Sequence, residues 1–302
     1  MKSMPDIASE AAPRSSGVLA KVGMTDIEIP VLVPSPQGMM LIPGKADAFV
    51  SLDQADAKGI HMSRLFLELT STLESKPCDA DSLRHILGLF LNSHQGLSKK
   101  AFVEVRYDLP LKRKALKSNH QGWRTYPLKW KGEASPEGVE LFLEVLVTYS
   151  STCPCSAALS RQLIQENFAR SFSDATLNFK DVHSWLGQEQ GISATPHGQR
   201  SHALVTMKVN STPDVVEILD QIEEALGTPV QAAVKREDEQ EFARLNATHL
   251  MFAEDAARKV ARALRTRDEF TDFRVEVTHF ESLHAHNASA IAVKGVLGGF
   301  LN

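Results

Sequence analysis

The chain has 302 residues, enough for one large domain or two of ordinary size. Its 43% hydrophobic and 23% charged residues are typical of a globular protein, and its net charge of -4 argues against a general nucleic-acid binder. The sequence contains no apolar run of the roughly 18 residues that a membrane helix needs, and no apolar secretory signal, so we expect no membrane association. Three cysteines cannot form a closed disulfide framework, which predicts a cytoplasmic protein.

The first half of the chain predicts a loose arm followed by strands and helices. Residues 1–25 are rich in Ser, Ala, Pro and Gly and show no periodicity. Strands are expected where apolar and polar residues alternate, and helices where Leu recurs at helical spacing. The expected order is strand 27–34, strand 48–52, helix 62–73, a helix through 83–90 capped by Asp79 or Asp81, and strands 101–108, 123–131 and 139–149.

The second half has a similar rhythm. Its expected elements are strand 203–209, helix 215–226, strand 229–234, helix 252–264, and strands 273–277 and 290–296. Both halves pair helices with antiparallel-type strands, which favours an α+β fold of two related modules. The predicted division is an arm (1–25), a first module (26–156), a linker with a helix and a polar loop (157–200) and a second module (201–302).

A basic stretch between Arg106 and Lys131 allows two interpretations. It is either a solvated hairpin with a charged face or a site for a polyanion, such as a triphosphate or an RNA backbone. Aromatic residues within it (Trp123, Tyr126 and Trp130) could stack on bases.

Cysteines and histidines at predicted strand ends suggest a metal site. Cys153-Pro-Cys155 directly follows an apolar strand, and we expect one thiol as a ligand and the other as support or catalyst. The alternative is a pair of small buried residues. The segment from His197 to His202 precedes a strand, and His284-Ala-His286 follows one. On an extended backbone the last two histidines would point in opposite directions, so that only one could face the site. One Cys and two His side chains are typical ligands of an open catalytic metal centre.

Acidic candidates lie in residues 235–239 and at Glu254. Glu254 is placed at the start of an amphipathic helix, where the helix dipole favours a carboxylate that could accept a pair of N–H groups. The simpler interpretation is an ordinary glutamate in a first helical turn.

Five segments, in this order, resemble motifs of the type IB GTP cyclohydrolases. They are Lys58-Gly-Ile-His-Met-Ser-Arg64, Thr152-Cys-Pro-Cys-Ser156, His197-Gly-Gln-Arg-Ser-His202, Lys235-Arg-Glu-Asp-Glu239 and Phe280-Glu-Ser-Leu-His-Ala-His286. The resemblance implies a tunnelling fold with two modules in each chain and a homotetramer with sites at subunit interfaces. The implied reaction converts GTP and water to 7,8-dihydroneopterin triphosphate and formate, the first step toward tetrahydrofolate.

The resemblance also implies roles for individual residues. A divalent metal, with Zn, Mn and Fe left open, would be bound by Cys153, His197, Glu239 and His284. Glu254 would anchor guanine. Formyl release and ring closure need proton transfers, and the chemistry leaves His197, His202 or His284 and the thiol of Cys155 as candidates. The triphosphate needs cationic partners. Either the basic stretch, with Lys112 and Arg113, or the segment of Lys58, His61 and Arg64 could supply them.

The sequence departs from the family's commonest pattern in two places. Glu237 stands where a proline is usual after Lys-Arg, and an insertion covers about residues 160–193. Two alternatives remain open: a non-catalytic tunnelling-fold protein that binds a purine or RNA, and a related pterin or deazapurine enzyme.

Overall fold

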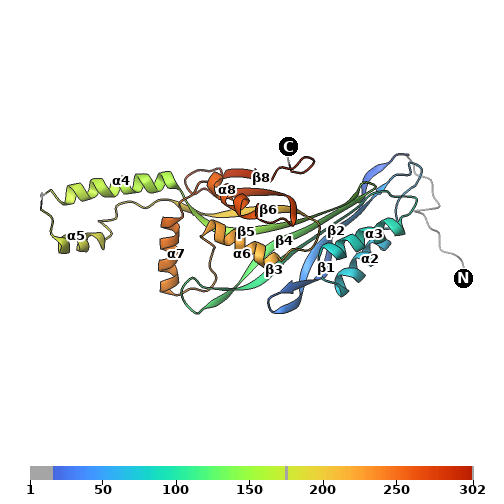
Figure 1. Cartoon of the computed structure of the whole chain (residues 1–302), viewed down its shortest axis with the longest axis horizontal. Coiled ribbons are helices and arrows are strands. Elements are labelled where there is room, and N and C mark those ends of the chain that lie inside the picture. The colour runs from blue at the N-terminus through green and yellow to red at the C-terminus, as the bar shows by residue number, and fades with distance from the viewer. Residues whose placement is uncertain (1–15, 174–175, 301–302) are drawn as a thin grey trace.

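The computed structural model describes residues 16–173 and 176–300. One antiparallel sheet of eight strands runs through the molecule, and each strand pairs with the next one along the chain (Figure 1). The strands are β1 (Leu19–Ser35), β2 (Gly38–Leu52), β3 (Ala101–Lys114), β4 (Gln121–Ser135), β5 (Gly138–Thr152), β6 (Gly198–Val209), β7 (Phe270–His279) and β8 (Ala288–Val293).

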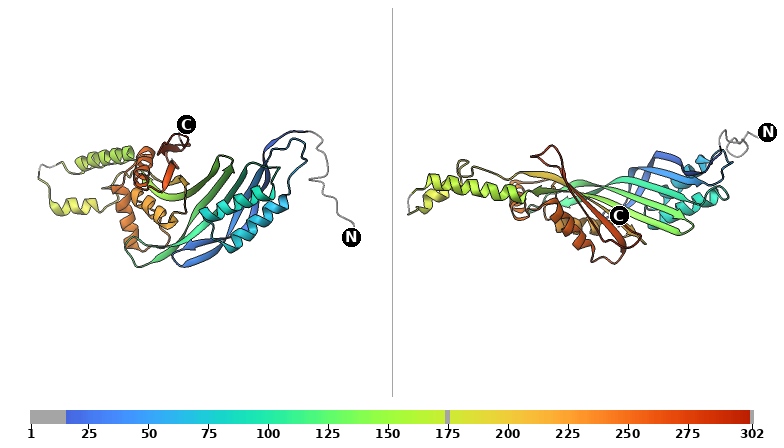
Figure 2. Two further views of the ribbon diagram at one scale, coloured as in Figure 1. Left: turned by 45° about the vertical axis from the view of Figure 1, so that its right-hand side comes forward. Right: turned by 90° about the horizontal axis from the view of Figure 1, so that it is seen from above.

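The helices of the described residues lie between these strands in sequence. They are α2 (Met62–Ser75), α3 (Ala80–Ser93), α4 (Pro154–Ser171), α5 (Phe179–Leu186), α6 (Val215–Leu226), α7 (Arg236–Thr248) and α8 (Ala253–Leu264). The pair α2 and α3 packs on the first half of the sheet, and α6 and α8 pack on the second half (Figures 1 and 2). Alternate side chains of each strand point toward these helices and form the apolar core.

The element order repeats once along the chain. Two strands, a pair of helices and two strands make up β1 to β4, and the same order returns from β5 to β8, with α4, α5 and α7 inserted. The predicted α+β class is confirmed, and the repeat accords with two related modules. In this repeat β5 opens the second half, whereas the boundaries drawn from sequence assign it to the first.

Most predicted elements are present, with local corrections. The arm was drawn too long, because β1 already begins at Leu19; its residues 1–15 lie outside the described part of the chain. The strand expected at 229–234 is wrong: Pro229, which lacks an N–H group, makes a single bridge to Tyr149. The hydrogen bonds there come from Thr228, whose backbone carbonyl and hydroxyl both bond to Ser150.

Helix α7 was not predicted, for a physical reason. It lacks the apolar stripe that reveals a helix packed on a core, and Asp238 is its one buried residue. Tertiary contacts position it: Asn246 accepts a hydrogen bond from Ser150, and Asp238 binds the tip of the β3–β4 hairpin.

The predicted linker contains two helices that project from the body of the molecule (Figures 1 and 2). A small aromatic cluster of Phe168, Phe172 and Trp185 joins α4 to α5, and the Trp185 indole donates to the Ser171 hydroxyl at 3.2 Å. None of the helices in the described part of the chain is long and apolar enough to cross a membrane. Cys78, Cys153 and Cys155 are free thiols.

Candidate active site

Three segments that are distant in sequence meet where β5 ends. The N–H of Cys153 donates to the carbonyl of His197 at 3.3 Å, and the N–H of Met251 donates to the carbonyl of Thr152 at 3.2 Å. Because α8 starts two residues after Met251, its first turn, with Glu254, lies at the same end of the sheet. The structure therefore brings the segments of Cys153, His197 and Glu254 together.

The two cysteines of this end occupy the start of α4. Cys153 is the N-cap residue, Pro154 holds the first helical position, and the Cys153 sulfur makes no capping hydrogen bond. The Cys153 thiol therefore takes no part in capping the helix. Cys153 is half-buried and Cys155 is exposed in the first turn. The Ser156 hydroxyl accepts from the His197 N–H at 3.1 Å, which ties the helix start to the His197 segment.

The His197 side chain is mostly buried, with 20% of it exposed. Its Nδ1 lies 3.0 Å from Oε1 of Gln199 and 3.9 Å from a carboxylate oxygen of Glu281. Neither partner was identified from sequence, although both lie within motifs already noted. Gln199 had a usable signal: alternation in β6 places it on the buried face, where a polar side chain needs a partner.

His202 lies on the opposite face of the sheet from Gln199. The alternation in β6 turns its side chain to the face that the helices do not cover, and its ring makes an edge contact with Phe280 at 4.7 Å. Burial lowers the pKa of His202, and the charge of Arg200 lowers it further. If His202 transfers protons, it does so on the face of the sheet that the helices do not cover.

His284 and His286 do not point in opposite directions, contrary to the expectation from sequence. Their rings stack at 5.0 Å with an interplanar angle of 7°. The reason is that residues 282–286 form a series of bends instead of an extended strand. Both imidazoles are therefore presented together in the loop between β7 and β8.

The two glutamates singled out from sequence lie on different helices. Glu254 is exposed in the first turn of α8, and Asp255, not Glu254, accepts from the N–H of Phe252 to cap that helix. The Glu254 carboxylate therefore takes no part in capping α8. Glu239 is exposed in the first turn of α7, next to the buried Asp238.

The donors of one chain fit a metal ion only in part. Across residues 16–173 and 176–300, no three His, Cys, Asp or Glu side chains are grouped to share an ion. Thiolate, imidazole and carboxylate are suitable donors for a catalytic metal, and the Cys153 and His197 segments are adjacent. Glu239 and His284 do not complete the set within the single chain.

The segment from Lys58 to Arg64 lies at the other end of the sheet. Strand pairing places Val50, near the end of β2, beside Ala101 at the start of β3, and Ala101 beside Ala134 near the end of β4. The end of β4 lies next to the start of β5, so the end of β2 lies at the opposite end of the sheet from Cys153. The 15 residues of β5 span about 45 Å at the usual strand rise of ~3.3 Å per residue. Lys58 and Arg64 follow β2 at this far end, where Arg64 donates to the carbonyl of Ser93 at 2.6 Å.

The tip of the β3–β4 hairpin lies at the same sheet end as Cys153, with α7 packed between them. Lys112 and Arg113 line a small cavity of about 340 Å³ there. Arg113 already donates to the Tyr126 hydroxyl at 2.9 Å and pairs with Asp220. Lys112 makes no ion pair within the described part of the chain, so of these two residues it is the better candidate for a phosphate.

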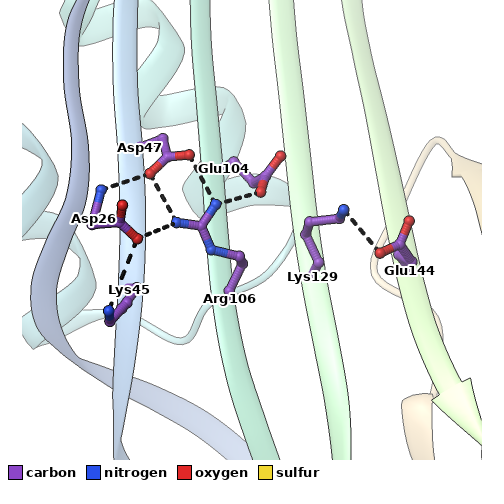
Figure 3. A network of polar contacts seen from close by, with 7 residues as sticks. All are labelled: Asp26, Lys45, Asp47, Glu104, Arg106, Lys129 and Glu144. Atoms are coloured by element: carbon purple, nitrogen blue, oxygen red, sulfur yellow. Dashed lines mark hydrogen bonds and ion pairs between the residues drawn. The ribbon is translucent and has the colours of Figure 1, made fainter.

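Much of the basic stretch is neutralised by acidic partners on the open face of the sheet. Figure 3 shows Arg106 bonded to Asp26, Asp47 and Glu104, and Lys129 bonded to Glu144 at 2.9 Å. Tyr126 and Trp130 are 3% and 1% exposed, so neither can stack on a base as suggested from sequence. Trp123 is the exposed aromatic of that set. The arrangement favours a paired, structural role for most of the stretch.

Solved structures of similar fold define the class of protein. Uricase from Arthrobacter globiformis superposes with a TM-score of 0.53 over 94% of this chain and 96% of that one, at 8% identity. A uricase from Bacillus fastidious gives a TM-score of 0.53 over 90% of this chain and 92% of its own, at 7% identity. At such low identity the likeness concerns the fold alone, and it identifies the architecture as a tunnelling fold.

Sequence comparison then gives the family. Residues 4–290 match the family described as type I GTP cyclohydrolase folE2. A relative named GTP cyclohydrolase FolE2 from Pseudoalteromonas translucida is 51% identical over 98% of this chain and 99% of its own length. One of the same name from Hydrogenovibrio crunogenus is 48% identical over 98% of this chain and 96% of its own. The chain belongs to the type I GTP cyclohydrolase FolE2 family.

Proposed function

We propose that this chain is a GTP cyclohydrolase that converts GTP and water to 7,8-dihydroneopterin triphosphate and formate. The observation that carries the proposal is the meeting of the Cys153, His197 and Glu254 segments at one end of β5. These segments supply a thiol, an imidazole and a carboxylate, which are the groups that hydrolytic ring opening and purine recognition require. The names of relatives with up to 51% identity over nearly the whole chain support the same reaction.

The family is metal-dependent, and we propose a divalent ion (Zn, Mn or Fe) held by Cys153, His197, Glu239 and His284. Such an ion, when bound, supplies a Lewis acid that lowers the pKa of water toward ~7. The described residues of one chain group only part of this donor set.

Glu254 is proposed to bind the guanine ring. Its carboxylate can accept the N1–H and the 2-amino group as a bidentate pair, which adenine cannot offer. Cys155 is exposed beside the N-cap Cys153, and His202 has a pKa lowered by burial. Both are therefore candidates for the proton transfers of formyl release and ring closure.

The proposed site is shared between chains. Lys58, His61 and Arg64 lie at one end of the sheet and Cys153 at the other, and the 15 residues of β5 between these ends span about 45 Å, far more than the length of one GTP molecule. If both ends bind the same substrate, the Lys58 segment must come from a neighbouring subunit. This supports the homotetramer with interfacial sites that the family resemblance implies.

Subunit mixing tests this arrangement. Lys58→Ala and Cys153→Ala proteins should each be inactive, and co-assembled oligomers should regain activity because some sites combine two intact ends. Differently tagged chains and tandem purification establish that mixed oligomers formed. Mixed oligomers that stay inactive would contradict a shared site.

The reaction itself is tested with purified protein. Incubation with GTP should give a fluorescent neopterin product, formate and a metal-dependent rate, with the product identified by mass. Nucleotide binding without turnover would favour the non-catalytic alternative, and a different product mass would favour the related pterin or deazapurine enzyme.

A further inference from the structure

Three buried polar side chains lie together beneath the strand ends that carry Cys153 and His197. Gln199 on β6 is 8% exposed, and Ser151 on β5 and Ser201 on β6 are completely buried. Strand pairing places Gln199 directly opposite Ser151. Polar groups within an apolar core are costly unless they are hydrogen-bonded, so a polar group at this position calls for specific partners.

The Gln199 amide has a partner at each of its two ends. Its Oε1 lies 3.0 Å from Nδ1 of His197, and its Nε2 donates to the Ser151 hydroxyl at 2.9 Å. The Ser151 hydroxyl in turn lies 2.8 Å from the hydroxyl of Ser201. The amide is therefore held between β5 and β6, with its carbonyl end against the imidazole.

Two oxygen acceptors face Nδ1 of His197. One is Oε1 of Gln199, and the other is a carboxylate oxygen of Glu281, 3.9 Å from the same nitrogen. The Glu281 oxygen is too distant for a hydrogen bond, but its negative charge favours a proton on Nδ1. In a neutral imidazole one nitrogen carries the proton and the other accepts. Both neighbours therefore favour the Nδ1–H tautomer, and Gln199 supplies the acceptor for that proton.

The backbone of His197 is also fixed in place. Its N–H donates to the Ser156 hydroxyl at 3.1 Å, and its carbonyl accepts from the Cys153 N–H at 3.3 Å. Within residues 16–173 and 176–300, the hydrogen bond of the His197 ring is made through Nδ1. Once Nδ1 carries the proton, Nε2 keeps its lone pair for a ligand or a proton at this end of the sheet.

We propose that Gln199 is a positioning residue for His197: its side-chain carbonyl holds the imidazole as the Nδ1–H tautomer, so that Nε2 is the nitrogen that binds a cation or accepts a proton beside Cys153. Gln199 acts through His197 and is itself buried beneath the site. The inference rests on the proposed function only in assigning His197 to the site.

The test uses Gln199→Leu in the full-length protein. Leucine fills a similar space without an amide, and Ser151 and Ser201 can still bond to each other. Nitrogen-15 NMR of histidine-labelled protein without added metal reports the tautomer, with the His197 signal identified by its absence from a His197→Asn variant. We expect Nδ1–H in the wild type and a shift toward Nε2–H in Gln199→Leu, because Nδ1 loses its hydrogen-bond acceptor.

Zinc binding gives a second measurement. Hydrogen bonds that orient a metal-binding histidine typically change metal affinity by about 10–100-fold when they are removed. Titration with zinc alone, in competition with a chelator, should therefore show about 10–100-fold weaker binding by Gln199→Leu than by the wild type.

Three variants separate the hydrogen bond from other effects. Gln199→Glu restores an oxygen acceptor and should keep the Nδ1–H tautomer. Glu281→Gln removes the more distant charge and should keep it as well. Gln162→Leu makes the same substitution at an exposed glutamine of α4, so it should change neither the tautomer nor the zinc affinity. Should Gln199→Leu fold poorly, Ser151→Ala removes the acceptor of the Gln199 N–H and should shift the tautomer in the same direction.

Two outcomes would overturn the inference. One is an Nε2–H tautomer of His197 in the wild type. The other is a folded Gln199→Leu protein that keeps the wild-type tautomer or the wild-type zinc affinity. Failure of the proposed function looks different: the wild type would form no neopterin product, while the tautomer measurement would still report on the bond between Gln199 and His197.

Discussion

Asp238 in the first turn of α7 binds Ser118 at the tip of the β3–β4 hairpin, 120 residues earlier in the chain. One carboxylate oxygen accepts from the Ser118 N–H at 2.8 Å and the other accepts from its hydroxyl at 2.6 Å. The same carboxylate accepts from the N–H groups of Lys117 and Lys235. These bonds hold the pKa of Asp238 well below its usual range, against the opposing effect of burial. The hairpin that carries Lys112 is thereby fixed to α7.

Replacing Asp238 with Asn should loosen this hairpin. The amide offers a single oxygen acceptor and sets an NH₂ group against backbone N–H donors, so we expect Tm to fall by several degrees. Since the pKa of Asp238 is lowered in the folded state, the wild-type carboxylate contributes stability above its ordinary pKa of 3.8 and loses it only as the pH falls toward the lowered value.

Differential scanning calorimetry and hydrogen exchange at residues 115–120 measure this change. Glu237→Gln alters an exposed carboxylate in the same helical turn and serves as the control. An Asp238→Asn protein with the Tm of this control would show that the contact does not stabilise the fold.

Two buried histidines predict a loss of stability in mild acid. Burial lowers the pKa of His94 and of His279 from the ordinary value of 6.5. Below about pH 6.5 the unfolded chain therefore binds protons that the folded chain does not, so the free energy of unfolding decreases until the pH reaches the lowered values. Above about pH 6.5 these histidines are neutral in both the folded and the unfolded chain, so they add no pH dependence to the free energy of unfolding.

Urea unfolding at about pH 7.5 and about pH 5.5 tests this prediction, with a lower midpoint expected at the acidic pH. His94→Gln should reduce the difference between the two midpoints. His183→Gln, at an exposed position on α5, should leave it unchanged. A wild-type midpoint that rises on acidification would contradict the prediction.

Sequence patterns predicted the fold where one physical signal dominated. The alternation of Leu141, Leu143 and Val145 indicated β5. Of the two N-cap candidates for α3, Asp79 and Asp81, the structure selects Asp79, whose side chain accepts from the Ser82 N–H. Helix α7 carries no apolar stripe, and its position depends on long-range bonds through Asp238 and Asn246. Such contacts leave no periodic trace in the sequence.

The site could be predicted as a set of segments but not as a geometry. The motifs of Cys153 and His197 lie together, as their shared position at strand ends suggested. The stacking of His284 on His286 depends on bends that short-range sequence did not reveal. The separation of Lys58 from Cys153 follows from strand direction, which becomes clear only when the pairing of the whole sheet is known.

Removal of the Cys153 thiol should abolish both turnover and metal binding. Cys153→Ala deletes a proposed ligand whose sulfur makes no capping bond, so the fold should be retained. His284→Ala should behave in the same way. Metal analysis of purified protein, together with the neopterin assay, measures both effects. Cys78→Ala is the control, because that thiol is 2% exposed and burial raises its pKa. Full activity in metal-depleted Cys153→Ala protein would refute the metal assignment.

The last prediction separates the two glutamates, Glu254 and Glu239. In the GTP complex, Glu254→Gln would keep the side-chain shape but bring an amide N–H against a guanine donor. Loss of a charged hydrogen bond and an unpaired donor should together cost about 2–4 kcal/mol. The expected result is a severe fall in kcat/KM for GTP with the metal content unchanged. Glu239→Gln should instead lose metal and activity together, since Glu239 is proposed as a ligand. Steady-state kinetics and metal analysis of both variants distinguish these roles. If Glu254→Gln released the metal while GTP still bound normally, the two assignments would have to be exchanged.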